Sequence, residues 1–187
     1  PPSIRGSIQY PGIFGILNWG SVSIDEGRQV MIVNSSAIPQ IVQLYPRTGG
    51  ARDDTATGNS HTAGYLPQTG TPYGVSLLPM LSPLGIPCEA PPWGHLTAID
   101  LKSRKVLWQR PLGTTQDSAP LGIPVPGVFN IGGSVTTKTG LSFIAATLDS
   151  YLRAFDVSSG KELWRGRLPA GGAHHVAHLL RRRQARY

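Results

Sequence analysis

The chain has 187 residues, of which 23 are glycine and 17 are proline, and only 14% of its residues are charged. This composition favours a turn-rich all-β protein and argues against a helical bundle. The formal net charge of +7 is unevenly placed, because four arginines lie in the last seven residues: Arg181, Arg182, Arg183 and Arg186. The rest of the chain is only mildly basic and has no basic-aromatic stripe, so we expect no nucleic-acid partner.

The sequence offers few markers of compartment or of common catalytic motifs. Cys88 is the only cysteine, so no internal disulfide can form and the redox environment is not readable from it. There is no run of 18 apolar residues and no apolar signal-peptide core at the start, and we expect no membrane span within this sequence. No phosphate-binding loop, G-x-S-x-G or C-x-x-C motif occurs.

In chain order, the first half alternates short strand signals with irregular stretches. Residues 1–17 are rich in glycine and proline, and the sequence SVSIDEGRQVMIVN at 21–34 predicts a β-hairpin. Residues 39–46, PQIVQLYP, predict an edge strand because a proline stands at both ends. A long polar segment follows at 48–71, and six prolines between 72 and 92 exclude a long helix there.

The second half contains the clearest pattern. Residues 141–168 hold three short apolar runs, LSFIAAT, YLRAFDV and ELWRGRL, separated by turn signals at 149–150 and 158–161. Alternating apolar positions mark half-buried strands, and the clusters of Asp, Ser and Gly supply the turns. We therefore predict an antiparallel meander of about one propeller blade's length.

A second copy of this unit lies earlier in the chain. Residues 96–112 align with residues 152–168 at a constant offset of 56 residues, with Leu, Ala, Asp, Lys, Trp and Leu at matching places. Self-similarity at such a period is typical of radially repeated sheets. We expect Trp108 and Trp164 to be structural, each wedged between neighbouring blades, and Asp100 and Asp156 to accept amide hydrogen bonds in the turns.

Several motifs carry a resemblance to a known family. They are GTPYG (70–74), LSPLGIPC (81–88), PPWG (91–94), the two A-x-D…W hairpins and GRLPAGG (166–172). Through them, residues 1–172 resemble the quinoprotein dehydrogenases, above all the membrane-bound glucose dehydrogenases that use pyrroloquinoline quinone (PQQ) and their relatives acting on quinate and shikimate. Residues 173–187 form a basic tail that departs from the family pattern, and a shifted reading frame or a misplaced gene end would explain it.

The resemblance implies an all-β fold, about three blades of an eight-bladed propeller with long Pro/Gly-rich loops, with PQQ on the axis beside a calcium ion. The chain would be the C-terminal part, with the membrane anchor, the catalytic base and most calcium ligands in the remainder. The intact enzyme would oxidise an aldose such as glucose at C1, or a cyclic polyol such as quinate. Electrons would pass to ubiquinone at the periplasmic face of the bacterial inner membrane. We expect this part alone to be inactive and, with unpaired sheet edges, marginally folded.

The resemblance also suggests site residues. It implies that Asn18 and Trp19 face the cofactor and that Asn34 lies close to the quinone, where an amide can donate a hydrogen bond to a quinone oxygen. The residues alone equally permit a turn asparagine beside a core tryptophan, and a strand-end asparagine that caps the next turn. Asp149 matches a family aspartate associated with electron transfer to ubiquinone, although by its pattern alone it is a hairpin-turn aspartate.

A tryptophan and a group of histidines are further candidate site residues, and a scaffold protein is the alternative function. Trp93, in the PPWG motif, is expected to be a packed aromatic, with a place near the cofactor funnel as the alternative. Three histidines in the tail have a helical metal-ligand spacing, but no glutamate accompanies them and we expect no metal site: His174, His175 and His178. The rival function is a non-catalytic propeller scaffold, such as an outer-membrane assembly lipoprotein. Its regular blades with short loops would not contain the irregular stretches at 48–92 and 111–127.

Overall fold

A computed structural model describes residues 1–12, 17, 20, 22–47, 65–119 and 123–169. These residues form strands and turns and no helix, as the composition predicts. The chain divides into two compact units. The first unit comprises Pro1–Ile13 and Ile38–Glu89, and the second comprises Phe14–Ala37 and Ala90–Tyr187. No helix in the described part of the chain is long and apolar enough to cross a membrane.

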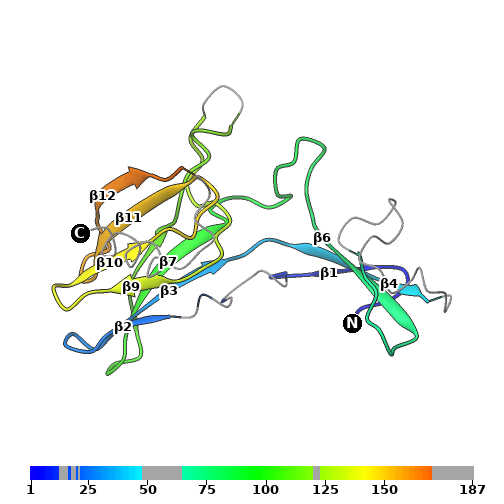
Figure 1. Ribbon diagram of the computed structural model, residues 1–187, viewed down its shortest axis with the longest axis horizontal. Helices are drawn as coiled ribbons and strands as arrows, with labels where there is room; N and C mark the ends of the chain where they lie inside the picture. Colours follow the sequence, from blue (N-terminus) through cyan, green and yellow to red (C-terminus); the bar gives the residue numbers. More distant parts are fainter. Residues whose placement is uncertain (13–16, 18–19, 21, 48–64, 120–122, 170–187) are drawn as a thin grey trace. The chain divides into compact units, whose positions relative to one another are not determined.

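The second unit contains two four-stranded antiparallel sheets (Figure 1). One is a continuous meander of β9 (Ser134–Thr136), β10 (Leu141–Ile144), β11 (Tyr151–Asp156) and β12 (Glu162–Arg167). The other has the order β2-β3-β7-β8, with β2 (Ser23–Asp25), β3 (Val30–Ser36), β7 (Gly94–Asp100) and β8 (Val106–Pro111). The predicted meander and the predicted hairpin at 21–34 are both confirmed.

The two sheets are copies of one design. β7 and β8 pair as β11 and β12 do, and in both pairs the register shifts at the same repeat position, between Ala98 and Ile99 and between Ala154 and Phe155. The β2–β3 hairpin takes the place of β9 and β10, although 52 residues of the first unit separate β3 from β7. Because Val30 to Ser36 pair continuously with Asp100 to Gly94, the insertion leaves the blade's ladder intact.

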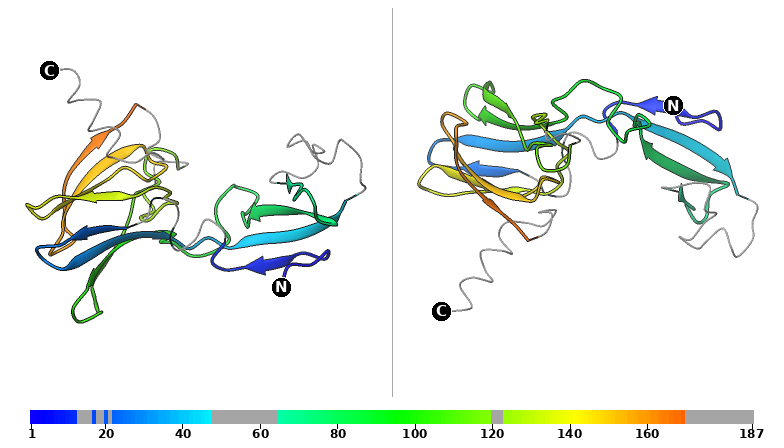
Figure 2. Two further views of the ribbon diagram at one scale, coloured as in Figure 1. Left: turned by 60° about the horizontal axis from the view of Figure 1, so that its bottom comes forward. Right: turned by 90° about the horizontal axis from the view of Figure 1, so that it is seen from above.

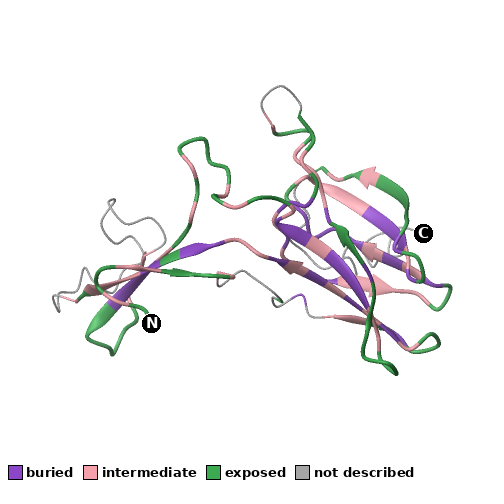
Figure 3. Cartoon of the chain, turned by 180° about the vertical axis from the view of Figure 1, so that it is seen from behind, coloured by how far each residue is buried: buried purple, intermediate pink, exposed green. Residues whose placement is uncertain are grey.

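An apolar core is shared by these two sheets. Figure 2 shows the strands of the two sheets facing each other, and Figure 3 colours the buried stretches of these strands. The first sheet supplies alternate residues of β3 and β7 together with Trp108 and Leu112, and the second supplies β10 and β11. The buried cluster is Val30, Ile32, Leu96, Ala98, Trp108, Leu112, Ile144, Ala146, Phe155 and Val157. Period-two alternation thus directs one face of each sheet into a shared core, which we call the blade seam.

The first unit is built on a third sheet, with the order β1-β4-β6-β5. Its strands are β1 (Ser7–Gln9), β4 (Gln40–Pro46), β5 (Tyr65–Leu66) and β6 (Tyr73–Pro79). The prediction that residues 39–46 form an edge strand is wrong, since β4 lies between β1 and β6. The two prolines stand at the strand's ends, where the missing N–H groups cost little of the ladder.

The partial all-β propeller is confirmed, with three four-stranded sheets among the described residues. Two of them are the repeated blades of the second unit, while the third is assembled from the chain's start and from the insertion between β3 and β7. Cys88, predicted to be outside any disulfide, is a free and exposed thiol.

Candidate functional site

Asn34, the predicted cofactor neighbour on β3, is buried and crosses the blade seam. Its Nδ2 donates to Asn130 Oδ1 at 2.8 Å and to the Gly132 carbonyl at 2.9 Å. Both acceptors belong to the segment that leads into β9, on the other sheet. The two amide hydrogens of Asn34 are therefore already used within the protein.

Asn130 and Ser36 complete this polar cluster. The Asn130 backbone N–H donates to Ser36 Oγ at 3.0 Å, and Ser36 Oγ donates in turn to the Asn130 carbonyl at 3.2 Å. The Asn130 side chain donates to the Ser35 carbonyl at 3.0 Å. These hydrogen bonds cross the seam and fix the position of the 130–133 segment relative to β3.

The chain just after the other two predicted cofactor residues reaches the same place. A Cβ on Gly20 would overlap the backbone of Gly132, so these backbones touch in a way that glycine alone permits. Asn18 and Trp19 themselves lie outside the described residues. Since Gly20 follows them directly, the structure brings the sequence neighbour of Asn18 and Trp19 against the segment that Asn34 holds.

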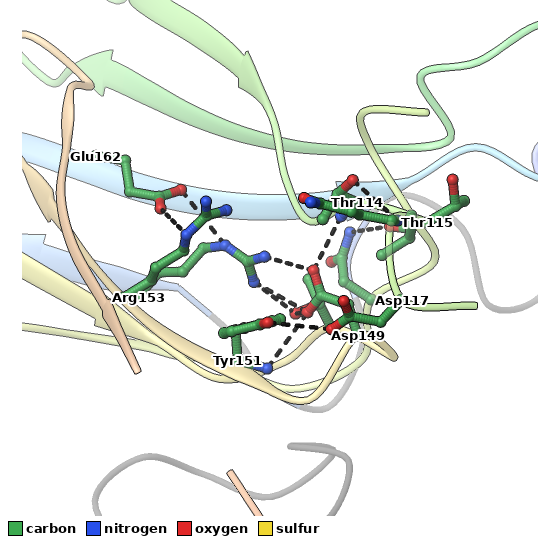
Figure 4. A network of polar contacts seen from close by, with 12 residues as sticks. Thr114, Thr115, Asp117, Asp149, Tyr151, Arg153 and Glu162 are labelled. Carbon is green, nitrogen blue, oxygen red and sulfur yellow. Dashed lines mark hydrogen bonds and ion pairs between the residues drawn. The ribbon is translucent and has the colours of Figure 1, made fainter. Parts of the chain in front are cut away.

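Asp149 lies at the turn between β10 and β11 and belongs to a second polar cluster (Figure 4). It forms an ion pair with Arg153, whose side chain is only 2% exposed. Arg153 Nη1 donates to Asp149 Oδ1 at 3.0 Å, and Arg153 Nη2 donates to Asp149 Oδ2. Thr147 Oγ1 donates to Asp149 Oδ1 at 2.5 Å, and the Thr114 backbone N–H donates to Oδ2 at 2.9 Å. Asp149 therefore ties the loop after β8 to the turn of the neighbouring blade.

Burial alone would raise the pKa of the Asp149 carboxyl, but hydrogen bonds from Arg153 and Thr147, with the arginine charge, outweigh it. The net effect lowers the pKa below its ordinary value of 3.8. The carboxylate is therefore ionised at neutral pH and matched by a buried guanidinium. Arg153 also contacts Glu162, with Nε and Oε2 3.4 Å apart.

The two clusters are joined through the backbone. Asn130 and Thr147 form an isolated antiparallel bridge, and the Ile131 N–H donates to the Ala146 carbonyl at 2.9 Å. We call the connected group the seam network, and it consists of Asn34, Ser36, Asn130, Thr147, Asp149 and Arg153. It places two residues predicted for different tasks, Asn34 and Asp149, on one continuous polar path between the blades.

From the sequence we identified only Asn34 and Asp149 among these six residues and missed four members of the network: Ser36, Asn130, Thr147 and Arg153. Arg153 occupies an alternating position of YLRAF that the pattern assigns to the interior, and a charged residue there is a signal for a buried ion pair. Asn130 stands in the FNIGG stretch before a strand, where its spacing carries no comparable signal. Its role depends on Asn34, which is 96 residues away.

The tryptophans divide into buried and exposed members. Trp93 is buried, as expected of a packed aromatic in the PPWG motif. Trp108 is wedged into the blade seam at 8% exposure, and its prediction is confirmed. Trp164, at the matching position of the second blade, is 52% exposed, which differs from the expected wedge. β12, which carries Trp164, is an outer strand of its sheet, and no strand follows it among the described residues.

The predicted turn aspartates behave as expected. Asp100 accepts the Ser103 N–H at 2.5 Å, and Asp156 accepts the Ser159 N–H at 2.8 Å. These serine hydrogen bonds lower the pKa of both carboxyls. The tail with His174, His175 and His178 lies outside the described residues.

The fold and the paired W-bearing hairpins match a family of known proteins. The family model described as PQQ "Glucose/ethanol/alcohol dehydrogenase, beta-propeller domain" covers residues 1–182. The chain belongs to this family. It is 46% identical over 180 residues to the quinoprotein glucose dehydrogenase of Escherichia coli K12, and 45% identical over 177 residues to the probable quinate dehydrogenase (quinone) of Xanthomonas campestris pv. juglandis. These alignments cover 92% and 91% of the chain but only 23% and 22% of the relatives.

A solved structure agrees with the fold of this chain. The quinohemoprotein alcohol dehydrogenase of Comamonas testosteroni superposes with a TM-score of 0.56 at 19% identity. The match covers 90% of the chain and 21% of that structure. The described residues therefore represent part of a larger propeller.

The hydrogen bonds of Asn34 and the packing of Gly20 limit what these two residues could contribute to a PQQ site. Asn34 would have to exchange one of its two hydrogen bonds to donate to a quinone oxygen. The close contact between Gly20 and Gly132 is filled by backbone rather than open to a ligand. In the described part of the chain, no group of three or more His, Cys, Asp or Glu side chains is placed to hold a metal ion.

Proposed function

We propose that this chain is the C-terminal part of a PQQ-dependent dehydrogenase that oxidises an aldose, with glucose first among the candidates. The identity of 46% to a glucose dehydrogenase supports this choice. A cyclic polyol such as quinate or shikimate is the second candidate, because two relatives named for those substrates are 45% and 44% identical. When bound, PQQ supplies the two-electron acceptor for the alcohol carbon.

The observation that carries a cofactor role for this chain is the convergence at the blade seam. Asn34 holds the 130–133 segment, and that segment lies against Gly20, the residue after Asn18 and Trp19. In our proposal Asn18 and Trp19 contact PQQ directly. Asn34 is a positioning residue that fixes the backbone behind them. The catalytic base and most ligands of a calcium ion would come from the remainder of the enzyme.

We further propose that Asp149 takes part in passing electrons to ubiquinone at the periplasmic face of the inner membrane. The support for this role is the seam network, which connects Asp149 to the 130–133 segment behind the proposed cofactor residues. A charged Asp149 also holds Arg153, and this structural role must be separated from any role in electron transfer.

A titration of the purified chain with PQQ and Ca²⁺ tests the cofactor role. Quinone absorbance and tryptophan fluorescence report binding, and a dye-linked assay with glucose reports turnover. We expect binding without turnover, and we expect Asn34→Ala to weaken binding. Gln109→Ala is the matched control, since Gln109 lies on the outer strand β8 and its amide donates to Thr97 Oγ1 of β7 at 3.2 Å, away from the seam network.

Each outcome of the titration has a distinct meaning. Turnover of glucose by the chain alone would contradict the assignment of the base to the remainder of the enzyme. Saturable binding that is equally strong in the Asn34→Ala variant would contradict the positioning role. Absence of binding would show that residues 1–187 do not form a sufficient cofactor wall.

Substrate and electron transfer are best tested in a chimera. Residues 1–169 would replace the matching stretch of the Escherichia coli quinoprotein glucose dehydrogenase, and oxidation of glucose and quinate would be compared. Loss of glucose oxidation with gain of quinate oxidation would favour the second candidate. In this chimera, a role of Asp149 in electron transfer predicts that Asp149→Asn slows reduction of ubiquinone but not of an artificial dye. A purely structural role predicts equal losses with both acceptors.

A further inference from the structure

The loop after β8 lies over the Asp149 carboxylate. The structure describes two legs of this loop, residues 113–119 and residues 123–127. We call the first leg, residues 113–119, the arm. Its Thr114 N–H donates to Asp149 Oδ2, and the Asp149 side chain is only 4% exposed. Contact between Asp149 and an electron acceptor is therefore blocked while the arm is in this position.

Each leg of the loop joins the folded blades through a glycine. Leu112 and Val128 are buried, and the Val128 N–H donates to the Leu112 carbonyl at 2.9 Å, so the base of the loop is anchored. Directly outside them, Gly113 and Gly127 have left-handed backbones, with φ of 83° and 79°. Because glycine adopts backbone angles that other residues avoid, this pair is placed to act as a hinge between the anchored base and the arm.

The two legs are hydrogen-bonded to each other. The Thr115 N–H donates to the Val125 carbonyl at 3.0 Å, and the Val125 N–H donates to Thr115 Oγ1 at 2.9 Å. The N–H groups of Ser118 and Ala119 donate to the Thr115 carbonyl at 2.9 and 2.8 Å. None of these four bonds involves the β9–β12 sheet. The two legs can therefore turn together about the glycines without losing them.

A second contact between the arm and the β9–β12 sheet is exposed, and we call it the latch (Figure 4). Asp117 Oδ2 lies 2.7 Å from Arg167 Nη1 and accepts the Tyr151 hydroxyl at 3.0 Å. Tyr151 and Arg167 are partners in the β11–β12 ladder, so the sheet holds them side by side. The side chains of Asp117 and Arg167 are 34% and 63% exposed. Water and salt therefore weaken the latch far more than they weaken the buried contact at Asp149.

We propose that the arm opens and closes over Asp149, that the latch holds it closed, and that opening gives an electron acceptor access to this carboxylate. Asp117 and Arg167 are then positioning residues, because they act on Asp149 by holding the arm in place. The access role rests on the proposed function of Asp149, whereas the movement of the arm does not.

Amide hydrogen exchange, followed by NMR on the full chain, tests the movement. We expect Asp117→Asn to raise the exchange rate of the Thr114 N–H roughly two- to fivefold, the range that corresponds to losing an exposed ion pair. The Thr115 N–H should keep the parent rate, because its bond to Val125 turns with the arm. Added salt should accelerate Thr114 exchange relative to Thr115 in the parent but not in Asp117→Asn, where the charge is gone.

Two further variants complete the exchange experiment. Arg167→Met breaks the latch from the other side and should reproduce the effect of Asp117→Asn, with no further increase in the double variant. Glu26→Gln is the matched control, since it removes an exposed carboxylate from the β2–β3 turn, and it should leave Thr114 exchange at the parent rate.

The access role is tested in the chimera described above, where Asp117→Asn should speed reduction of ubiquinone by a similar factor and leave reduction of the dye unchanged. Unchanged Thr114 exchange in Asp117→Asn, or equal acceleration of Thr114 and Thr115, would overturn the hinged movement. Faster Thr114 exchange with unchanged reduction of ubiquinone would overturn the access role. If Asp149→Asn slowed both acceptors equally, the proposed function of Asp149 would fail, while the exchange results would still decide whether the arm moves.

Discussion

Replacing Arg153 with methionine tests whether the seam network stabilises the fold. The change keeps most of the aliphatic volume but leaves the Asp149 carboxylate, whose side chain is 4% exposed, without its guanidinium. Removing one partner of a buried ion pair typically costs about 3–5 kcal/mol. For a chain of this size, such a loss corresponds to a fall in Tm of about 6–20 °C. A loss of about 3–5 kcal/mol is a large part of the free energy of unfolding of a typical domain, which is roughly 5–15 kcal/mol.

Urea unfolding followed by tryptophan fluorescence would measure the loss. Arg165→Met is the matched control. Arg165 stands opposite Arg153 in the β11–β12 ladder, but its side chain is 53% exposed and its Nε lies 3.8 Å from Glu162 Oε1. An exposed pair of this kind contributes about 0–1 kcal/mol. The Asp149→Asn, Arg153→Met double variant should lose less stability than the two single losses combined, because the partners interact directly.

Either of two results would show that the Asp149–Arg153 pair does not stabilise the fold in this way. The first is an Arg153→Met variant whose free energy of unfolding lies within about 1 kcal/mol of that of Arg165→Met, which is the range expected for exposed pairs. The second is additive losses in the double variant, since they would show that the two side chains do not stabilise each other.

Two further predictions concern the seam and acid stability. Trp108→Ala should cost about 3–5 kcal/mol in urea unfolding, whereas Trp164→Ala should cost less than about 1 kcal/mol because its ring is half exposed; equal losses would contradict this. The pKa of Asp149 is lowered on folding, so its contribution is present above the ordinary value of 3.8 and disappears as the pH falls through the lower folded value. Urea midpoints measured from about pH 6 to 3 should therefore fall less steeply in Asp149→Asn than in the parent, and parallel slopes would contradict the prediction.

Much of the blade design follows from local sequence. The alternation in YLRAFDV predicts a strand, and the residues at 158–161 predict a turn directly after it. The structure has β11, this turn and β12 at these positions. The constant offset of 56 residues identifies Trp108 as a wedge because the repeat fixes which face each residue presents. The predicted edge strand at 39–46 failed because an edge is a property of the neighbours a strand has, which its own residues do not specify.

The seam network could not be predicted from the sequence for the same reason. Asn34 and Asn130 are 96 residues apart, and only the packing of one blade on the next brings their amides to 2.8 Å. Arg153 is recognisable in the sequence as a charged residue at an apolar position. The burial of its partner Asp149 is not, because it requires the loop after β8, whose Thr114 N–H donates to the carboxylate.

By itself, the sequence determined the strands, the turns, the repeat and the resemblance to quinoprotein dehydrogenases, because these depend on residues close together in the chain. Tertiary structure alone decided that β2–β3 and β7–β8 form one blade across an insertion of 52 residues. It also decided that Trp108 is covered while Trp164 is open. Burial depends on which surface lies opposite, and that surface is set by long-range packing rather than by the local pattern.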